Sequence, residues 1–215
     1  MIEAVVFDLD GVLLDSEQVW DEVREELVKE RGGRWHGQAQ TEMMGMSSVE
    51  WSRYMHDELD LPEPPEEISA EVVRRLDDVY RTRLPLIDGA HEAVERLAAR
   101  WPLGLASSSN REVIDLVLDL SGLARYFRVT VSSEEVPRGK PAPDVYLEAA
   151  RGLGVPPERC AAVEDSHNGI RSAKAAGMRT IAIPNRRFPP GEDALAEADV
   201  VLDSIAGLTP EVVAG

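Results

Sequence analysis

Short apolar segments that alternate with helical patterns are the feature of this sequence that most restricts its fold. Six segments are predicted to be buried strands because they are short and apolar, and the first is also rich in β-branched residues. They are residues 3–9, 103–106, 128–132, 160–163, 180–183 and 200–202. Amphipathic patterns of helical length lie between the later segments, over residues 90–100, 111–121, 144–152 and 169–176. Strands alternating with helices predict βαβ units and therefore an α/β fold with a Rossmann-like parallel sheet.

One long stretch, residues 16–87, interrupts this alternation. It contains no convincing strand, and helical patterns cover residues 16–31, 47–59 and 69–83, with a proline-rich connector at 61–65. We therefore predict an α/β core domain of residues 1–15 and 88–215 and an inserted all-helical domain of residues 16–87. The hinges are expected near Asp15 and between Pro85 and Gly89, where glycine gives the backbone freedom.

Composition excludes several classes of function. The 215 residues carry a net charge of −17, which disfavours binding to nucleic acids and to anionic membranes. A single cysteine, Cys160, rules out an intrachain disulfide framework and a multi-cysteine zinc site. No apolar run approaches the length of a membrane span, and the first residues lack the features of a signal peptide. We expect a cytoplasmic enzyme or regulator, monomeric by default.

Polar side chains follow the predicted strands at the edge where a parallel sheet binds its ligands. They are Asp8 and Asp10 after the first strand, Ser107 after the second, Lys140 after the third, and Glu164 and Asp165 after the fourth. Converging carboxylates repel one another, and hard oxygen ligands without histidine or cysteine indicate Mg²⁺. The hydroxyl and the ammonium group suit the oxygens of a phosphoryl group.

Each of these residues also has an ordinary structural explanation. An acidic residue at a strand end often forms a turn, Ser107 could belong to a helix-capping cluster, and Lys140 alone could be a solvated surface residue. Asp8 is harder to explain in this way, because it interrupts a buried strand and an unpaired buried carboxylate is costly. The four strand-end positions taken together, in order, favour a functional site.

The order of these residues resembles the motifs of the haloacid dehalogenase superfamily of phosphotransferases. The DxDG[VT] motif corresponds to Asp8-Leu9-Asp10-Gly11-Val12, and the motif that ends a strand in Ser or Thr corresponds to Ser107. The lysine motif corresponds to Lys140-Pro141-Ala142-Pro143-Asp144, and the acidic motif to Glu164-Asp165. The helical insertion resembles the cap of the subgroup that holds β-phosphoglucomutase, phosphoglycolate phosphatase and sugar-phosphate phosphatases.

The resemblance implies a role for each motif residue. Asp8 would be the nucleophile that forms an aspartyl-phosphate, and Asp10 the general acid and base. Ser107 and Lys140 would hold the phosphoryl oxygens. Mg²⁺ would be bound by Asp8, by the backbone carbonyl of Asp10 and by Asp165, with Glu164 beside or within the ligand shell.

Further residues are candidates for substrate binding. Ser108, Ser109 and Asn110 could donate hydrogen bonds to the phosphate or the substrate, or could cap the following helix. Trp20 could line the site, or could face the helical core with its apolar neighbours.

Three readings of the function follow. The first is a Mg²⁺-dependent phosphatase acting on a small phosphorylated metabolite such as a sugar or polyol phosphate. The second is a β-phosphoglucomutase-like phosphomutase. Two positions disfavour it: Trp20 replaces the histidine of those chains, and Ser47-Ser48 occupy the place of the arginine that binds the distal phosphate. Arg53 is near, so a bisphosphate substrate is not excluded. The third is non-enzymatic, a phosphorylatable receiver or a scaffold, but receivers are about half this length and a scaffold would not need both Asp8 and Asp10.

Overall fold

The sheet forms where the apolar segments predicted it. The structure is a computed structural model that describes all 215 residues. Six parallel strands have the order β3-β2-β1-β4-β5-β6. Their bounds are β1 Ala4–Phe7, β2 Leu103–Ser107, β3 Phe127–Ser132, β4 Cys160–Glu164, β5 Arg179–Ala182 and β6 Val200–Val201. The α/β prediction is confirmed, and the strand order reverses beside β1, which is where open sheets of this kind bind ligands.

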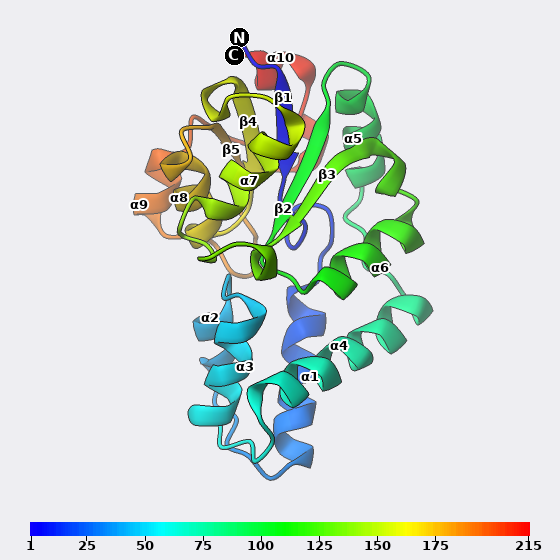
Figure 1. Cartoon of the computed structure of the whole chain (residues 1–215), viewed down its shortest axis with the longest axis vertical. Helices are drawn as coiled ribbons and strands as arrows, with labels where there is room; N and C mark the ends of the chain where they lie inside the picture. The colour runs from blue at the N-terminus through cyan, green and yellow to red at the C-terminus, as the bar shows by residue number, and fades with distance from the viewer.

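Helices cover both faces of this sheet (Figure 1). They are α5 Ala90–Ala98, α6 Arg111–Ser121, α7 Asp144–Leu153, α8 His167–Ala175, α9 Glu192–Glu197 and α10 Pro210–Ala214. Single turns of 3-10 helix lie at η1 Ala124–Tyr126, η2 Ser133–Glu135, η3 Pro157–Arg159 and η4 Ile205–Gly207. Side chains alternate along β1, so that Val5 and Phe7 face the layer of α5 and α6, whereas Ala4 and Val6 face the layer of α7 and α8.

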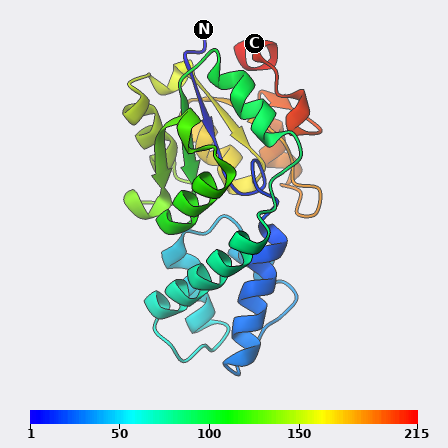
Figure 2. The same cartoon turned by 90° about the vertical axis from the view of Figure 1, so that its right-hand side faces the viewer.

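Four helices form a separate layer beyond the carboxyl ends of the strands (Figures 1 and 2). They are α1 Glu17–Glu30, α2 Ala39–Met43, α3 Ser48–Asp57 and α4 Pro65–Thr82, and we call residues 16–87 the helical block. The block contains no strand, and only an isolated bridge of Leu86 to Leu14 lies at its end. The short helix α2 was not predicted, and the connector expected at 61–65 ends in the first turn of α4, because Pro65 occupies the first helical position.

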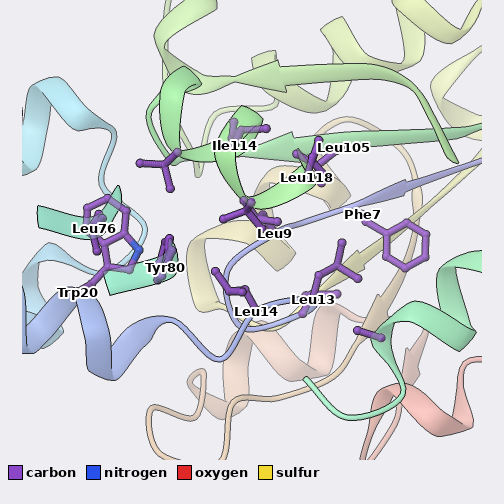
Figure 3. Packing of buried hydrophobic residues seen from close by; sticks show 14 of the residues in the cluster. Phe7, Leu9, Leu13, Leu14, Trp20, Leu76, Tyr80, Leu105, Ile114 and Leu118 are labelled. Atoms are coloured by element: carbon purple, nitrogen blue, oxygen red, sulfur yellow. The ribbon is translucent and has the colours of Figure 1, made fainter. Parts of the chain in front are cut away.

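The hydrophobic core continues from the sheet into the helical block. One cluster of 38 buried residues includes side chains of β1, α6, α1 and α4. Figure 3 shows Trp20, Leu76 and Tyr80 on the side of the helices, with Leu9 and Ile114 on the side of the sheet. The helical block is therefore packed against the sheet edge in this structure.

The two chain segments that connect the block to the sheet run side by side. The Asp15 N–H donates to the carbonyl of Pro85 at 2.8 Å, and the Ile87 N–H donates to the carbonyl of Leu13 at 3.0 Å. Gly89 follows with φ of +85°, a conformation that favours glycine. None of the helices in the chain combines the length and apolar composition that a bilayer crossing needs.

Candidate active site

The ends of β1 and β4 place two acidic side chains next to each other. Phe7 of β1 is level with Val163 of β4, and the Asp8 N–H donates to the carbonyl of Val163 at 2.9 Å. Asp8 and Glu164 therefore follow the same pair of strands at the same height. Both are buried, with exposed fractions of 6% and 0%.

Lys140 joins these two carboxylates. Its Nζ donates to Oδ1 of Asp8 and to Oε1 of Glu164, both at 2.6 Å, and to the carbonyl of Ala106 at 3.1 Å. Burial alone would lower the pKa of Lys140, but the charges of Asp8 and Glu164 outweigh burial and raise this pKa above its usual range. The ammonium group is charged at neutral pH, and it engages only Oδ1 of Asp8, so Oδ2 stays available for chemistry.

Glu164 is saturated with donors from the protein. Its Oε2 accepts from the N–H groups of Asp165 and Ser166 at 3.0 and 3.2 Å, and from Oγ of Ser166 at 3.1 Å. Its Oε1 also accepts from the hydroxyl of Tyr146 at 2.8 Å. Glu164 is therefore built to hold Lys140 and the following loop in place. Tyr146 was not predicted, since a tyrosine on an amphipathic helix looks the same in sequence whether it supports a site or only the core.

Asp165 supplies an acidic oxygen that no protein group satisfies. Its Oδ2 is buried and has no hydrogen-bond partner. Carboxylate oxygens of Asp8, Glu164 and Asp165 lie within 4.8 Å of one another. Burial raises the pKa of both Asp8 and Asp165 well above the usual range, and the negative charge of Glu164 adds to this effect. A hard divalent cation held by oxygen ligands fits this cluster.

The side chain of Asp10 is held from two sides. Its Oδ1 accepts from Oγ of Ser16 at 2.5 Å and from Nε1 of Trp20 at 3.3 Å, both in the helical block. Its Oδ2 accepts from Oγ of Ser109 at 2.6 Å, which belongs to the sheet side. Ser16 precedes α1 but makes no side-chain cap hydrogen bond, because its hydroxyl is used on Asp10.

The polar residues 107–110, at the end of β2, make different contacts. Oγ of Ser107 accepts from the N–H of Ser109 at 3.0 Å, so its own proton is left to donate. Ser108 donates to the carbonyl of Gly45 in the helical block at 3.2 Å, and Ser108 and Ser109 both line the same pocket as Asp8. Asn110 is not brought to this pocket: its Nδ2 donates to Ser69 and Glu134, each at 3.0 Å, in a second cleft.

A pocket of about 60 Å³ lies between the sheet edge and the helical block. From the sheet side it is lined by Asp8, Asp10, Ser108, Ser109, Lys140, Asp165 and Ser166, and from the block by Glu17, Trp20, Arg24, Met43, Met44, Gly45, Met46 and Trp51. Both alternatives for Trp20 hold, since it lines the pocket and is 5% exposed, packed on Trp51 with ring centroids 5.9 Å apart. The volume admits a few water molecules but not a sugar phosphate.

Glu17 and Arg24 were not predicted as pocket residues. The signal was present, because Glu17, Trp20, Arg24 and Leu27 follow one another at intervals of three or four residues and so share one face of α1. A charged residue within an apolar stripe is a candidate for a buried functional group. Arg53, the arginine considered for a distal phosphate, is exposed and borders the second cleft instead.

This fold and site define a class of hydrolases in which a carboxylate cluster lies at the switch point of a parallel sheet under a helical insertion. The sequence matches the haloacid dehalogenase-like hydrolases over residues 2–177. The chain belongs to this family.

Relatives and solved structures within the family match nearly the whole chain. Hexitol phosphatase B of Escherichia coli (strain K12) is 34% identical over 218 residues, which cover 100% of this chain and 97% of that protein. The crystal structure of CbbY from Rhodobacter sphaeroides in complex with phosphate has a TM-score of 0.87 and 28% identity, and the match covers 100% of both chains. A mutant of the same CbbY in complex with xylulose-(1,5)bisphosphate has a TM-score of 0.85 and 28% identity over 99% of both chains.

Proposed function

We propose that this chain is a Mg²⁺-dependent phosphomonoesterase that hydrolyses a sugar or polyol phosphate through an aspartyl-phosphate on Asp8. The observation that carries the proposal is the buried cluster of Asp8, Lys140, Glu164 and Asp165, which opens to the same pocket as Asp10. Similarity to a hexitol phosphatase supports the reaction and the substrate class.

Asp8 suits the nucleophile because one of its oxygens is fixed and the other is free. Lys140 holds Oδ1 at 2.6 Å, so Oδ2 would attack phosphorus while the ammonium group offsets the negative charge of the phosphoryl oxygens. The free proton of the Ser107 hydroxyl would serve one of these oxygens. The bond from phosphorus to the leaving oxygen breaks as the Oδ2–P bond forms, and that oxygen leaves as an alcohol with a proton from Asp10. Water would then attack phosphorus and break the Oδ2–P bond, which releases inorganic phosphate and restores the Asp8 carboxylate.

Asp10 suits the acid and base of the two steps. It is held by donors from both sides of the pocket, and a carboxyl in this position would protonate the leaving oxygen and then take a proton from the attacking water. The indole of Trp20 donates a hydrogen bond to Asp10 but has no proton to exchange near neutral pH. Trp20 therefore cannot exchange a proton with Asp10 as a histidine could, which favours water as the phosphoryl acceptor.

The buried acidic oxygens would hold the metal. Asp8 and Asp165 are the side-chain ligands we propose, together with the backbone carbonyl of Asp10, and Glu164 would hold Lys140 beside them. When bound, the metal supplies positive charge that allows an anionic nucleophile to meet an anionic substrate.

We also propose that residues 16–87 act as a cap domain that opens and closes over the site, with its hinges in the paired segments near Asp15 and Pro85–Gly89. The position of the pocket supports this, because residues of both the sheet edge and the helical block line it. We place the enzyme in the cytoplasm as a monomer, and light scattering on the purified chain tests the latter.

A substrate screen tests the function. Purified protein is assayed against sugar and polyol phosphates with Mg²⁺ or with a chelator, and both inorganic phosphate and isomerised sugar phosphate are measured. We expect phosphate release that requires Mg²⁺. Efficient conversion of a hexose 1-phosphate to the 6-phosphate, dependent on a bisphosphate primer, would establish a phosphomutase instead.

A further inference from the structure

The guanidinium group of Arg24 is fixed in the pocket by two tryptophans. Its central carbon lies 4.4 Å from the ring centroid of Trp20 and 4.7 Å from that of Trp51. Arg24 is 5% exposed, yet it lines the pocket that contains Asp8. Stacking on indole rings holds an arginine in place without using its hydrogen-bond donors.

Those donors are almost unused. A guanidinium group has five N–H donors, and the one hydrogen bond that Arg24 makes is from Nη1 to Oε1 of Gln40 at 3.4 Å. Its Nε is buried and has no partner. Burial lowers the pKa of Arg24 only to about 10, so the group is charged at neutral pH. A buried, charged and unpartnered donor is costly unless a ligand completes it.

Gln40 and Glu17 are linked to Arg24 by hydrogen bonds. Nε2 of Gln40 donates to Oε2 of Glu17 at 2.9 Å, and this links the carboxylate of Glu17 to the amide that contacts Arg24. We call these three residues the Glu17–Gln40–Arg24 group. Gln40 does not line the pocket and uses its amide to hold the other two residues, whereas Glu17 and Arg24 line the pocket with a carboxylate and a guanidinium group, an acceptor and a donor that neighbouring hydroxyl groups need.

The balance of charge in the pocket disfavours a second phosphate. Four carboxylates line it, from Asp8, Asp10, Glu17 and Asp165, and its cations are Lys140 and Arg24. Lys140 is already paired with Asp8 and Glu164, and Arg24 faces the negative charges of Glu17 and Asp10. With a divalent cation and one phosphoryl group in place, no uncompensated positive charge remains on the helical side.

We propose that the Glu17–Gln40–Arg24 group binds the hydroxyls of an uncharged leaving group and makes the enzyme select monophosphates over bisphosphates. This inference rests on the proposed phosphatase function and adds its specificity determinants. It sets the chain apart from the related CbbY whose mutant was crystallised with a bisphosphate.

The first measurement compares substrates on the wild-type enzyme. The probes are p-nitrophenyl phosphate, whose leaving group has no hydroxyl besides the oxygen that leaves phosphorus, and three pairs: glucose 6-phosphate with glucose 1,6-bisphosphate, fructose 6-phosphate with fructose 1,6-bisphosphate, and sorbitol 6-phosphate with sorbitol 1,6-bisphosphate. We take the pair whose monophosphate is hydrolysed fastest, and there we expect kcat/KM for the monophosphate to be at least tenfold higher than kcat/KM for its bisphosphate. A bisphosphate that is hydrolysed equally well overturns the inference and leaves the phosphatase function standing, whereas no hydrolysis of any probe overturns both.

The second measurement uses variants of the group. Arg24→Met is expected to raise KM for the preferred monophosphate at least tenfold more than KM for p-nitrophenyl phosphate. In Arg24→Lys, which keeps the positive charge, we expect a smaller rise in KM for the monophosphate. Glu17→Gln is expected to reduce the preference for the monophosphate over its bisphosphate at least threefold, because it removes the negative charge beside Arg24. Arg53→Met is the matched control, an exposed arginine of the helical block outside the pocket, and should alter none of these ratios.

Misfolding and lost recognition are separated within the same experiment. A variant that hydrolyses p-nitrophenyl phosphate and melts cooperatively is folded, so its ratios report recognition alone. If Arg24→Met does not fold, Arg24→Lys and Glu17→Gln still decide the outcome. Folded variants with wild-type ratios between the probes overturn the proposal.

Discussion

At the scale of single residues, the site depends on how Lys140 and Glu164 restrain Asp8. Lys140 lies between two buried carboxylates, and Glu164 in turn accepts hydrogen bonds from four protein groups besides Lys140. Such a network keeps Asp8 at one place and in one orientation before substrate arrives, which lowers the entropy that the reaction must lose. A substitution of Asp8 that tests this arrangement must remove the nucleophilic oxygen and keep the shape of the side chain.

Asp8→Asn meets this requirement. The amide keeps the size of the side chain but cannot attack phosphorus and adds no charge to a metal, so we expect the rate of phosphate release to fall by at least about 10³-fold. The melting temperature and circular dichroism spectrum serve as controls for folding. Near wild-type release of phosphate by a folded Asp8→Asn protein would show that the nucleophile lies elsewhere.

Glu17 gives the protein a pH-dependent stability. Burial, followed by the charge of Asp10, raises the pKa of Glu17 from 4.5 to about 7. The folded state then holds this proton more tightly than the unfolded chain, so the contribution of Glu17 to stability is greatest below pH 4.5 and falls as the pH rises towards 7. We expect the unfolding free energy of the wild type, relative to Glu17→Gln, to fall by about 2–3 kcal/mol between pH 5 and pH 8.

Denaturant titrations of both proteins across this range measure the difference. Because every other titrating group is shared, subtraction isolates Glu17. Parallel curves for the two proteins would show that Glu17 titrates as it does in the unfolded chain.

The residues that we propose for catalysis could be predicted from the sequence, and those that we propose for substrate recognition could not. Asp8, Ser107 and Asp165 occur at strand ends and Lys140 lies in the loop between β3 and α7, at the sheet edge where topology brings distant residues together. Arg24 owes its place to the way α1 packs on Trp51 and to the position of Gln40, neither of which is encoded locally. Asn110 shows the opposite case, since it follows a motif strand but its side chain turns towards α4.

At the scale of elements, the loop after β1 is shaped by a glycine. Gly11 has φ of +77°, and a Cβ atom there would lie 1.8 Å from Oδ2 of Asp165. Gly11→Ala therefore adds both backbone strain and a collision with the unsatisfied carboxylate oxygen. We expect a loss of kcat/KM of at least about 100-fold, because displacements of about 1 Å in a site cost this much.

Gly122→Ala is the matched control. Gly122 also has a positive φ, +68°, but nothing lies within 4 Å of its Cβ position. This variant should lose some stability through strain and keep its kinetic constants. Equal activity of the two variants would mean that Asp165 tolerates displacement and is not a ligand.

Prediction of the elements succeeded where periodicity is long or strongly apolar. The six strands and the helix over residues 111–121 agree with the structure to within two residues at each end. The five residues of α2 are too few to show a helical period, and α4 begins at Pro65, in a stretch that reads as a connector because proline usually interrupts helices. Short elements take their conformation from tertiary contacts, which a single sequence does not display.

At the scale of the whole molecule, the helical block and the sheet meet through polar contacts as well as apolar ones. Glu134 lies at this boundary: its Oε1 accepts from Oγ of Ser48 at 2.5 Å and from Nδ2 of Asn110 at 3.0 Å. If the helical block opens as we propose, the hydrogen bonds that cross this boundary, from Ser48 to Glu134 and from Ser108 to Gly45, would break. We propose that the bridge between Leu14 and Leu86 lets the two connecting segments move together.

We expect the protein to open in solution and to close around product. Hydrogen exchange with and without Mg²⁺ and inorganic phosphate measures this, because the peptide segments around Gly45 and Ser108 should gain protection when phosphate binds. Residues of β1 and β4 supply the control, since they lie in the sheet interior and should exchange equally slowly in both conditions. Identical protection around Gly45 in both conditions would mean that the block does not move.

The order of the strands also has a consequence for the synthesis of the chain. β1 is made first but occupies the middle of the sheet, between β2 and β4. During synthesis, β1 can pair with β2 only after Leu103 has been made, and with β4 only after Cys160 has been made. Helices α1 to α4, in contrast, contact one another within residues 16–87. The helical block can therefore assemble while the sheet is still incomplete, and Asp8, the proposed nucleophile, reaches its final surroundings only when Glu164 has emerged.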